Sequence, residues 1–385
     1  MEIYLYNKGD IYMTSRVVTE FLELVQIDSE TFHEEKISPV LQEKLKALGF
    51  NVFVDDAHTR NGHASGNIIA TLPGNVDADT IYFTTHMDTV VPGVGIKPII
   101  KEDGYIYSDG TTILGADDKA GIAALLELGK RIKEEKIEHG TIEYIITAGE
   151  ESGLAGAKEL DPALVTAKYG FAVDSDGKVG GIVTAAPFQT KIEATLRGKT
   201  AHAGVEPEKG ISAITIAAKA IAKMKLGRLD AETTANIGRF EGGKATNIVC
   251  DEAYVLAECR SLNEEKLTVQ ENHMKAAFEE AAAEMGGEVE VDVKRMYPGF
   301  HFAEEDLVVQ VAKEAAVNIG REAKIMQSGG GSDANVIAGF GIPTVNLAVG
   351  YENIHTTKEC IPVVELEKLA DLLVEVVKVS ATKKA

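Results

Sequence analysis

Cysteine is scarce in this sequence, whose 385 residues include three: Cys250, Cys259 and Cys360. No two of them form a C-x-x-C pair, and an odd number cannot complete a framework of disulfides. Free thiols of this kind usually pack as small hydrophobic groups in proteins of a reducing compartment. The sequence therefore excludes a small scaffold held together by disulfide bonds.

Long hydrophobic runs are missing as well. No stretch reaches the ~18 consecutive apolar residues that a membrane-spanning helix needs. The first residues also lack the basic segment followed by an apolar one that is typical of a secretory signal. We therefore expect no membrane partner, and a cytoplasmic location is the default prediction.

Basic residues are outnumbered by acidic ones. The chain has 39 Lys and Arg against 60 Asp and Glu, which gives a formal net charge of −21. Recognition of phosphate needs clustered positive side chains. The composition therefore argues against nucleic acid as a partner.

The sequence does contain enough apolar material for two packed cores. Hydrophobic residues make up 45% of the chain, and a domain usually holds ~100–200 residues. A clear helical period begins only near Thr14. A start at Met13, with residues 1–12 as an extraneous leader, is therefore an open alternative.

Helix-like and strand-like segments alternate through most of the chain. Helices are expected to begin at Thr14 and at Glu34, and Gly49 is placed to end the second. Strand-like runs occupy residues 52–54, 67–72, 80–85, 141–147 and 169–173, and a further helix is expected over residues 119–133. This alternation predicts an α/β domain with a mostly parallel mixed sheet covered by helices.

A change of pattern sets residues 187–297 apart. A strand, a helix, two strands, a helix and a strand follow one another there, which is the βαββαβ order of ferredoxin-like modules. The α/β alternation resumes after this segment. We therefore predict one α/β domain split into residues 1–186 and 298–385, because insertion is tolerated where chain ends lie close together.

Acidic and imidazole side chains recur where predicted strands end. His86 follows the strand at residues 80–85, and an open α/β sheet binds its ligands at that end of its strands. Comparable positions are held by Asp117 and Asp118, by Glu150 and Glu151, by Asp174 and by His355. Each has an ordinary alternative as an N-cap, a solvated loop, a turn or a surface histidine. Their common location favours one shared site.

A shared crevice would combine two imidazoles with three carboxylates. The residues would be His86, Asp117, Glu151, Asp174 and His355, a donor set suited to zinc or a neighbouring first-row ion. Without a cation these carboxylates would repel one another. If one carboxylate bridges, two ions about 3.5–4 Å apart can be held with a bridging water between them.

Glu150 and Asp88 would complete the chemistry. Adjacent side chains on an extended segment diverge, so Glu150 is free to act as general base toward the water and later as acid toward the leaving amine. Asp88 lies two residues after His86 and therefore on the same side of the strand. Its carboxylate can accept the second imidazole N–H and fix the tautomer.

The order of these motifs resembles the M20 metallopeptidases, most closely their peptidase T (tripeptide aminopeptidase) branch. The matching segments are His86-x-Asp88, Gly115-Ala116-Asp117-Asp118-Lys119-Ala120-Gly121, Gly149-Glu150-Glu151, Asp174 and Asn353-Ile354-His355, and the resemblance covers nearly the whole chain. It implies a zinc-peptidase catalytic domain in which Asp117 bridges two zinc ions and is followed by a cis peptide bond. His86 and Asp174 would complete one zinc site. Glu151 and His355 would complete the other.

By the same resemblance the inserted module is a lid that also forms a homodimer interface. Lys199-Thr200-Ala201-His202-Ala203-Gly204 is similar to the segment that brings a histidine to the substrate, so His202 would stabilise the oxyanion. Asn247 and Arg260 resemble the residues that bind the carboxylate end of the substrate. The loop containing Gly330, Gly331 and Ser332 resembles the substrate loop. A turn histidine and a flexible linker are the simpler alternatives.

These resemblances predict an enzyme that releases the N-terminal residue of tripeptides, with Asp88 and Glu150 beside two zinc ions. Co²⁺ or Mn²⁺ could replace Zn²⁺, because similar ligands accept all three. A dizinc N-acyl amino acid deacylase or carboxypeptidase of the same fold is the nearest alternative, since pocket shape decides between these substrates. A non-catalytic peptide-binding protein is the alternative from another class.

Overall fold

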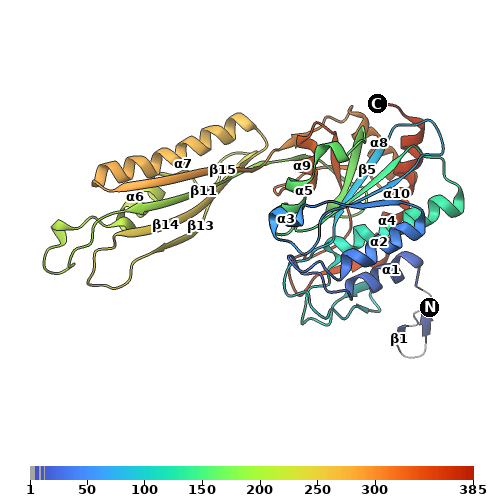
Figure 1. The fold of residues 1–385 in the computed structure, drawn as a ribbon, viewed down its shortest axis with the longest axis horizontal. Helices are drawn as coiled ribbons and strands as arrows, with labels where there is room; N and C mark the ends of the chain where they lie inside the picture. Colours follow the sequence, from blue (N-terminus) through green and yellow to red (C-terminus); the bar gives the residue numbers. More distant parts are fainter. Residues whose placement is uncertain (1–4, 8–9, 13) are drawn as a thin grey trace. The chain divides into compact units, whose positions relative to one another are not determined.

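The structure, a computed structural model, describes residues 5–7, 10–12 and 14–385. The chain forms two compact units, drawn in Figure 1. Unit 1 runs to Thr184 and includes Phe302–Gln327 and Ser332–Ala385, whereas unit 2 comprises Ala185–His301 and Ser328–Gly331. The alternative start at Met13 lies outside the described residues. Ahead of it, β1 (Leu5–Asn7) pairs antiparallel with β2 (Asp10–Tyr12).

Unit 1 is built on a mixed sheet in the order β10-β18-β9-β5-β8-β4-β3, with β17 beside β10. The strands are β3 (Asn51–Val54), β4 (Ile68–Leu72), β5 (Ile81–His86), β8 (Ile142–Thr147), β9 (Tyr169–Ser175), β10 (Gly181–Ala186), β17 (Lys324–Gln327) and β18 (Thr344–Ala348). The central strands β18, β9, β5 and β8 run parallel, so their carboxyl ends meet at one edge. The predicted α/β fold is confirmed.

Both faces of this sheet are buried. Neighbouring residues of one strand enter different cores: Phe83 lies in the larger core and Tyr82 in the smaller one. This is the alternation of side chains along a strand, with apolar residues on both sides. The sequence did not predict β10, which is buried along its whole length.

Helices provide the two covering layers. The larger core contains residues of α1 (Arg16–Val25), α2 (Ile37–Leu48), α4 (Ala116–Glu135), α8 (Leu307–Asn318) and α10 (Val363–Thr382). In α1, Val17, Val18 and Phe21 are buried, as the helical period predicts. The short helices are α3 (His58–Asn61), α5 (Ala155–Glu159), the 3₁₀ helix η1 (Pro162–Leu164) and α9 (Asp333–Gly339). Ile337 of α9 packs in the smaller core.

A small antiparallel sheet lies outside the main one in unit 1. It is formed by β6 (Ile99–Ile100), β7 (Tyr105–Tyr107) and β19 (Cys360–Pro362). These strands have two or three residues each, too few for a periodic pattern, and the sequence did not predict them. β19 nevertheless matters for the site, because it fixes the end of the loop that carries His355.

Unit 2 has the predicted ferredoxin-like order. Its elements are β11 (Phe188–Arg197), the 3₁₀ helix η2 (Pro207–Lys209), α6 (Ala213–Lys223), β12 (Gly227–Arg228), β13 (Thr233–Gly242), β14 (Glu252–Ser261), α7 (Glu264–Met285), β15 (Glu288–Tyr297) and β16 (Phe300–His301). The antiparallel sheet has the order β12-β13-β14-β11-β15. Ile216 of α6 and Phe278 of α7 share one core with Ile192 and Val255 of the sheet. Both helices therefore cover the same face.

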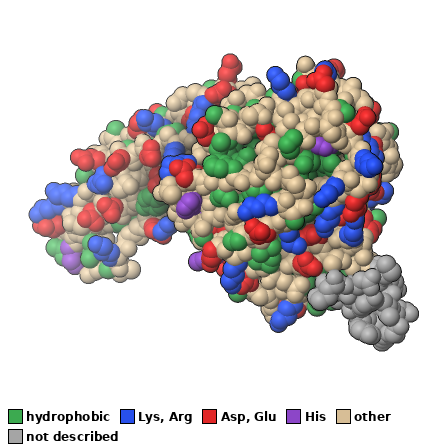
Figure 2. All heavy atoms as spheres, turned by 45° about the vertical axis from the view of Figure 1, so that its right-hand side comes forward, with side chains coloured by type: hydrophobic (Ala, Val, Ile, Leu, Met, Phe, Trp, Pro, Cys, Tyr) green, Lys and Arg blue, Asp and Glu red, His purple; other side chains and the backbone are tan. Residues whose placement is uncertain are grey.

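Charged side chains of both signs cover the surface. Figure 2 shows Lys and Arg interspersed with Asp and Glu over the described part of the face in view. Such mixing differs from the continuous cationic surface that phosphate recognition needs. Among the helices that the structure describes, none combines the length and the apolar composition of a membrane span.

Candidate metal centre

β5 delivers His86 to the edge where the parallel strands end. The His86 side chain is buried. Its Nε2 lies 3.0 Å from Asp117 Oδ1 and 3.8 Å from Asp174 Oδ1. Asp174 comes from β9, which pairs with β5 in the sheet. Two adjacent strands and the start of α4 therefore bring these three side chains together.

Asp117 presents one carboxylate oxygen to each of two imidazoles. Oδ1 lies near His86 Nε2, whereas Oδ2 lies 3.2 Å from His355 Nε2. The residue stands in the first turn of α4 with non-helical backbone angles, φ −83° and ψ 104°. The peptide bond between Asp117 and Asp118 is cis, as the resemblance implied.

His355 reaches this carboxylate from the loop between β18 and β19. Its Nε2 also lies 3.0 Å from Oε1 of Glu151, which follows β8. Among the described residues, three groups of side chains could each hold a metal ion: one consists of His86, Glu150 and Glu151, and the other two both include Asp117. These two are His86, Asp117 and Asp174, and Asp117, Glu151 and His355. The five predicted metal-ligating residues thus lie together.

Asp88 binds the turn that follows β8. Its Oδ1 accepts the N–H groups of Gly149 at 2.9 Å and Glu150 at 3.0 Å, and its Oδ2 accepts that of Glu151 at 3.2 Å. The prediction placed the Asp88 carboxylate against the second nitrogen of His86, but the nearer atom is the main-chain oxygen of Asp88. His86 Nδ1 lies 2.9 Å from the main-chain oxygen of Asp88 and 3.6 Å from its carboxylate.

Negative charge dominates this cluster. Among the described residues, the ion pairs of Asp117, Glu151 and Asp174 are with imidazoles alone. Hydrogen bonds to Asp117 and Glu151 raise the pKa of His355 to about 10, and burial raises the pKa of Asp174 to about 6. The raised pKa values mean that the cluster favours bound protons, which reduce its negative charge. A divalent cation would neutralise the same carboxylates, so the donor set fits such a cation.

The sequence reasoning missed Glu359. This side chain is 1% exposed, and its carboxylate accepts the N–H groups of Leu114, Gly115 and Asp117. It lies in a short polar stretch after His355 that has no period and no motif. Its position close to a predicted ligand was the one available signal.

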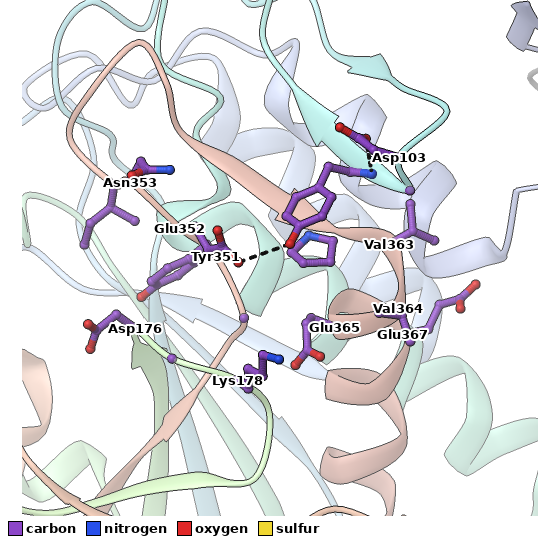
Figure 3. A pocket seen from close by; sticks show the side chains of 16 residues that line it. Asp103, Asp176, Lys178, Tyr351, Glu352, Asn353, Val363, Val364, Glu365 and Glu367 are labelled. Atoms are coloured by element: carbon purple, nitrogen blue, oxygen red, sulfur yellow. Dashed lines mark hydrogen bonds between the residues drawn. The ribbon is translucent and has the colours of Figure 1, made fainter.

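A cavity of about 710 Å³ opens beside Tyr351 (Figure 3). Its lining comes from residues 103–105, 176–178, 350–354 and 362–365, together with Glu367. The hydroxyl of Tyr105 donates to Glu352 Oε1 at 3.4 Å. The hydroxyl of Tyr351 donates to Asp174 Oδ1 at 3.1 Å. Tyr351, also missed in the sequence, thus links the cavity wall to the cluster.

Most of the predicted substrate-binding residues lie in unit 2. His202 is exposed, and its Nδ1 accepts the N–H of Gly204 at 3.2 Å. Asn247 is also exposed, and its carbonyl accepts the N–H of Ala203 at 2.9 Å. These contacts hold both residues in one loop region, and their roles toward substrate stay predictions.

Arg260 is engaged within unit 2. Its Nε and Nη2 donate to the two carboxylate oxygens of Glu258 at 3.0 and 3.1 Å, and its Nη1 donates to the carbonyl of Gly329 at 3.1 Å. The predicted loop residues Gly330 and Gly331 follow in the same unit. Arg260 is thus oriented along the glycine loop, with Glu258 in the fork of its guanidinium.

Ser332 lies in unit 1, where it caps α9. The Ser332 N–H donates to Asn335 Oδ1 at 3.0 Å, and its hydroxyl takes part in a capping box with the same residue. Asn346 Nδ2 also donates to the Ser332 hydroxyl, at 3.2 Å. The observed role of Ser332 is therefore to start the helix after the glycine loop.

Comparison with known proteins gives consistent results. A family model described as Peptidase family M20/M25/M40 matches residues 82–379. The protein YqjE of Bacillus subtilis (strain 168) is 64% identical over 366 residues, which are 95% of this chain and 98% of that protein. The crystal structure of aminopeptidase PepT from Bacillus cereus is 65% identical with a TM-score of 0.91, covering 96% of this chain and 98% of that one. A tripeptidase structure from Staphylococcus aureus is 52% identical with a TM-score of 0.93 and the same coverage.

Proposed function

Since this chain belongs to peptidase family M20/M25/M40, we propose that it is a dizinc aminopeptidase that removes the N-terminal residue of tripeptides. Family membership makes the chain a peptide hydrolase. The metal, the residue roles and the preference for tripeptides are the proposal. The names of two similar structures, an aminopeptidase PepT and a tripeptidase, support that preference.

The position of Asp117 between two imidazoles carries the proposal. One carboxylate oxygen faces His86 and the other faces His355, at 3.0 and 3.2 Å. A ligand that bridges two cations needs this arrangement. Asp174 would complete the site of His86, and Glu151 would complete that of His355.

The donor set favours zinc, because imidazole nitrogens and carboxylate oxygens are among its usual ligands. Two bound cations would polarise the peptide carbonyl and lower the pKa of an attacking water between them. Co²⁺ and Mn²⁺ accept similar ligands. Metal analysis of the purified protein, followed by removal and replacement of each ion, identifies the native metal.

Glu150 is suited to move the proton. It shares a turn with Glu151, and its partly buried carboxylate lies in one group with the His86 imidazole and the Glu151 carboxylate. Burial raises the pKa of Glu150 well above its usual range. We assign the ionised carboxylate of Glu150 to accept a proton from the attacking water and then to return it to the leaving amine.

The predicted substrate-binding residues would bind the rest of the substrate. We assign His202 to the developing oxyanion and Asn247 and Arg260 to the peptide carboxylate, with Gly330 and Gly331 as backbone donors and Ser332 at the loop end. The contact of Arg260 with Gly329 supports this grouping, because it joins the guanidinium to the glycine loop. A homodimer through unit 2 and a cytoplasmic location belong to the same proposal.

The Glu150→Gln variant tests the mechanism. Loss of a general base should lower kcat by about 10²–10⁴-fold, while metal content stays that of the wild type because Glu150 is not assigned as a ligand. Glu151→Gln is the matched control, since it changes a neighbouring assigned ligand and should lose metal. Hydrolysis by Glu150→Gln at the wild-type rate would rule out this role.

Substrate class is tested with three compounds of similar size. A tripeptide, its N-acetylated form and an N-acyl amino acid are compared at equal concentration. We expect hydrolysis of the free tripeptide alone, with release of its first residue. Turnover of the acylated compounds would favour the deacylase or carboxypeptidase alternative. Binding of a tripeptide without turnover, with metal fully loaded, would favour the non-catalytic alternative.

A further inference from the structure

The carboxylate of Glu359 contacts the backbone of the turn that carries Asp117. Its Oε2 accepts the N–H groups of Leu114 at 2.7 Å and Gly115 at 2.8 Å, and its Oε1 accepts that of Asp117 at 3.0 Å. The side chain is 1% exposed. One buried carboxylate thus takes up three backbone donors from a segment more than two hundred residues away in the sequence.

The backbone of this turn cannot satisfy these donors itself. Gly115 has φ 73° and Asp117 has φ −83° and ψ 104°, so neither residue has helical angles at the start of α4. The first N–H groups of a helix lack intrahelical acceptors in any case. Leaving them buried without partners would cost free energy, and carboxyl oxygens can accept all three. A glutamate at position 359 meets this need.

The same contacts determine where the Asp117 side chain points. Its carboxylate must turn one oxygen to His86 and the other to His355, and both distances are near 3 Å. A rotation of the backbone at Asp117 would move both oxygens at once. The hydrogen bond from the Asp117 N–H to Glu359 opposes that rotation.

We propose that Glu359 is a positioning residue that sets the metal affinity of the site by holding the backbone of Asp117. This inference rests on the proposed function, in which Asp117 bridges both cations. Because one ligand serves both ions, loss of the positioning should weaken both metal positions together. A residue that only stabilised the fold would leave metal affinity unchanged in the folded protein.

The Glu359→Gln variant of the full chain tests this inference. Glutamine keeps the shape but places an amide NH₂ against either Asp117 N–H or the pair from Leu114 and Gly115. Loss of a partner that orients a ligand typically lowers metal affinity about 10–100-fold. The probe is Zn²⁺ alone, titrated against a chromogenic chelator. With tripeptide, kcat should fall and KM should change little.

Glu143→Gln is the matched control. Glu143 is also buried and accepts the N–H groups of Thr166 and Ala167, but it lies toward the start of β8, away from the turn that follows the strand. Both variants should unfold more readily, whereas only Glu359→Gln should bind Zn²⁺ more weakly. The control thus separates a general loss of stability from a loss of positioning.

The outcomes are distinct. Wild-type Zn²⁺ affinity in a folded Glu359→Gln protein overturns the inference. If that variant does not fold, Glu359→Asp serves instead, because it keeps the carboxyl group but shortens the side chain by one methylene. Unchanged Zn²⁺ affinity of Glu359→Asp would likewise overturn the inference. Failure of the proposed function, with no peptide hydrolysed by the wild type, leaves the Zn²⁺ comparison valid, so the two failures can be told apart.

Discussion

The carboxylate of Asp88 accepts the backbone N–H of Glu150, at 3.0 Å. It also accepts the N–H groups of Gly149 and Glu151. One buried carboxylate therefore binds the turn that carries both Glu150, the proposed base, and Glu151, a proposed metal ligand. Hydrogen bonds to an ionised acceptor are stronger than those between neutral groups. Asp88 therefore orients the turn, in addition to its main-chain contact with His86.

The Asp88→Asn variant should lower kcat more than it changes KM. An asparagine has one carbonyl oxygen, so at least one of the three N–H groups would face an NH₂ group instead. By analogy with partners that orient metal ligands, we expect a loss of about 10–100-fold in activity. Steady-state kinetics with a tripeptide measures it.

Asp55→Asn is the control for Asp88. Asp55 is likewise buried and accepts N–H groups of Ala57 and Asn67, but it does not contact the turn of Glu150. Its replacement should lower stability without a comparable loss of kcat. Equal kinetic effects of the two changes would argue against a specific role for Asp88.

A second hydrogen-bond network also contacts this turn. His63 places Nδ1 2.8 Å from Glu34 Oε1 and Nε2 2.9 Å from the hydroxyl of Ser152, and its ring stacks on Phe32. Ser152 directly follows Glu151. We expect the buried carboxylate and the imidazole to be energetically coupled, since removal of either takes one hydrogen-bond partner from the other in a buried site.

A double-mutant cycle with Glu34→Gln and His63→Gln measures this coupling. Residues in one hydrogen-bond network show interaction energies of about 0.5–3 kcal/mol, and a value above about 1 kcal/mol is expected here. Urea unfolding of the four proteins provides the energies. If the two single changes add without interaction, the network does not act as a unit.

The general plan of the fold could be predicted from the sequence, because it depends on local patterns. The helical period predicted from Thr14 corresponds to α1, which begins at Arg16, and Gly49 follows α2 as predicted. The βαββαβ order of unit 2 follows from the same patterns. The short strands β6, β7 and β19 could not be predicted, since two or three residues carry no period.

The cluster of metal-ligating side chains could likewise be predicted from the sequence, whereas the residues that hold these side chains in place could not. His86, Asp117 and Asp174 stand at strand ends or helix starts, where the fold class alone brings them to one edge. Glu359 and Tyr351 depend on the course of a loop between β18 and β19, which no local pattern specifies. Their contacts with Asp117 and Asp174 become visible only in three dimensions.

Gly121→Ala should destabilise the protein although alanine favours helices. A Cβ at this position of α4 would lie 2.5 Å from Asp118 Oδ1 and 2.7 Å from the carbonyl oxygen of Val173. The backbone of β9 cannot move away easily, so overpacking should lower the free energy of unfolding by about 1–3 kcal/mol. Thermal unfolding measures the effect.

Gly129→Ala, on the same helix, is the control for Gly121. Its Cβ would meet the flexible end of Leu48 at 3.0 Å and the ring of Phe50 at 3.3 Å. These side chains can shift, and alanine adds helix propensity of up to about 1 kcal/mol. A stability near that of the wild type is therefore expected. A larger loss at Gly129 than at Gly121 would contradict the steric argument.

Glu20 should contribute a pH-dependent part of the stability. This buried carboxylate of α1 lies 2.6 Å from Lys44 Nζ and 2.8 Å from Lys130 Nζ, on α2 and α4. Burial alone would raise the pKa of Glu20, but hydrogen bonds from Lys130 and Lys44 outweigh it and leave the pKa below its usual value. A carboxyl whose pKa is lower in the folded state stabilises that state above its unfolded pKa, and the contribution fades as pH falls through the folded pKa.

Glu20→Gln should therefore be less stable than the wild type near pH 7, by about 1.5–3 kcal/mol for hydrogen bonds to a charged group. The difference should shrink as the pH is lowered below the usual carboxyl pKa of about 4.3. Glu43→Gln is the control, because Glu43 pairs with Lys46 on the solvent side of α2 and such pairs contribute little. Urea unfolding from pH 7 down to about pH 3, below the usual carboxyl pKa, measures both variants. A Glu20→Gln difference that does not change with pH would mean that the carboxylate charge does not stabilise the contact of α1 with α2 and α4.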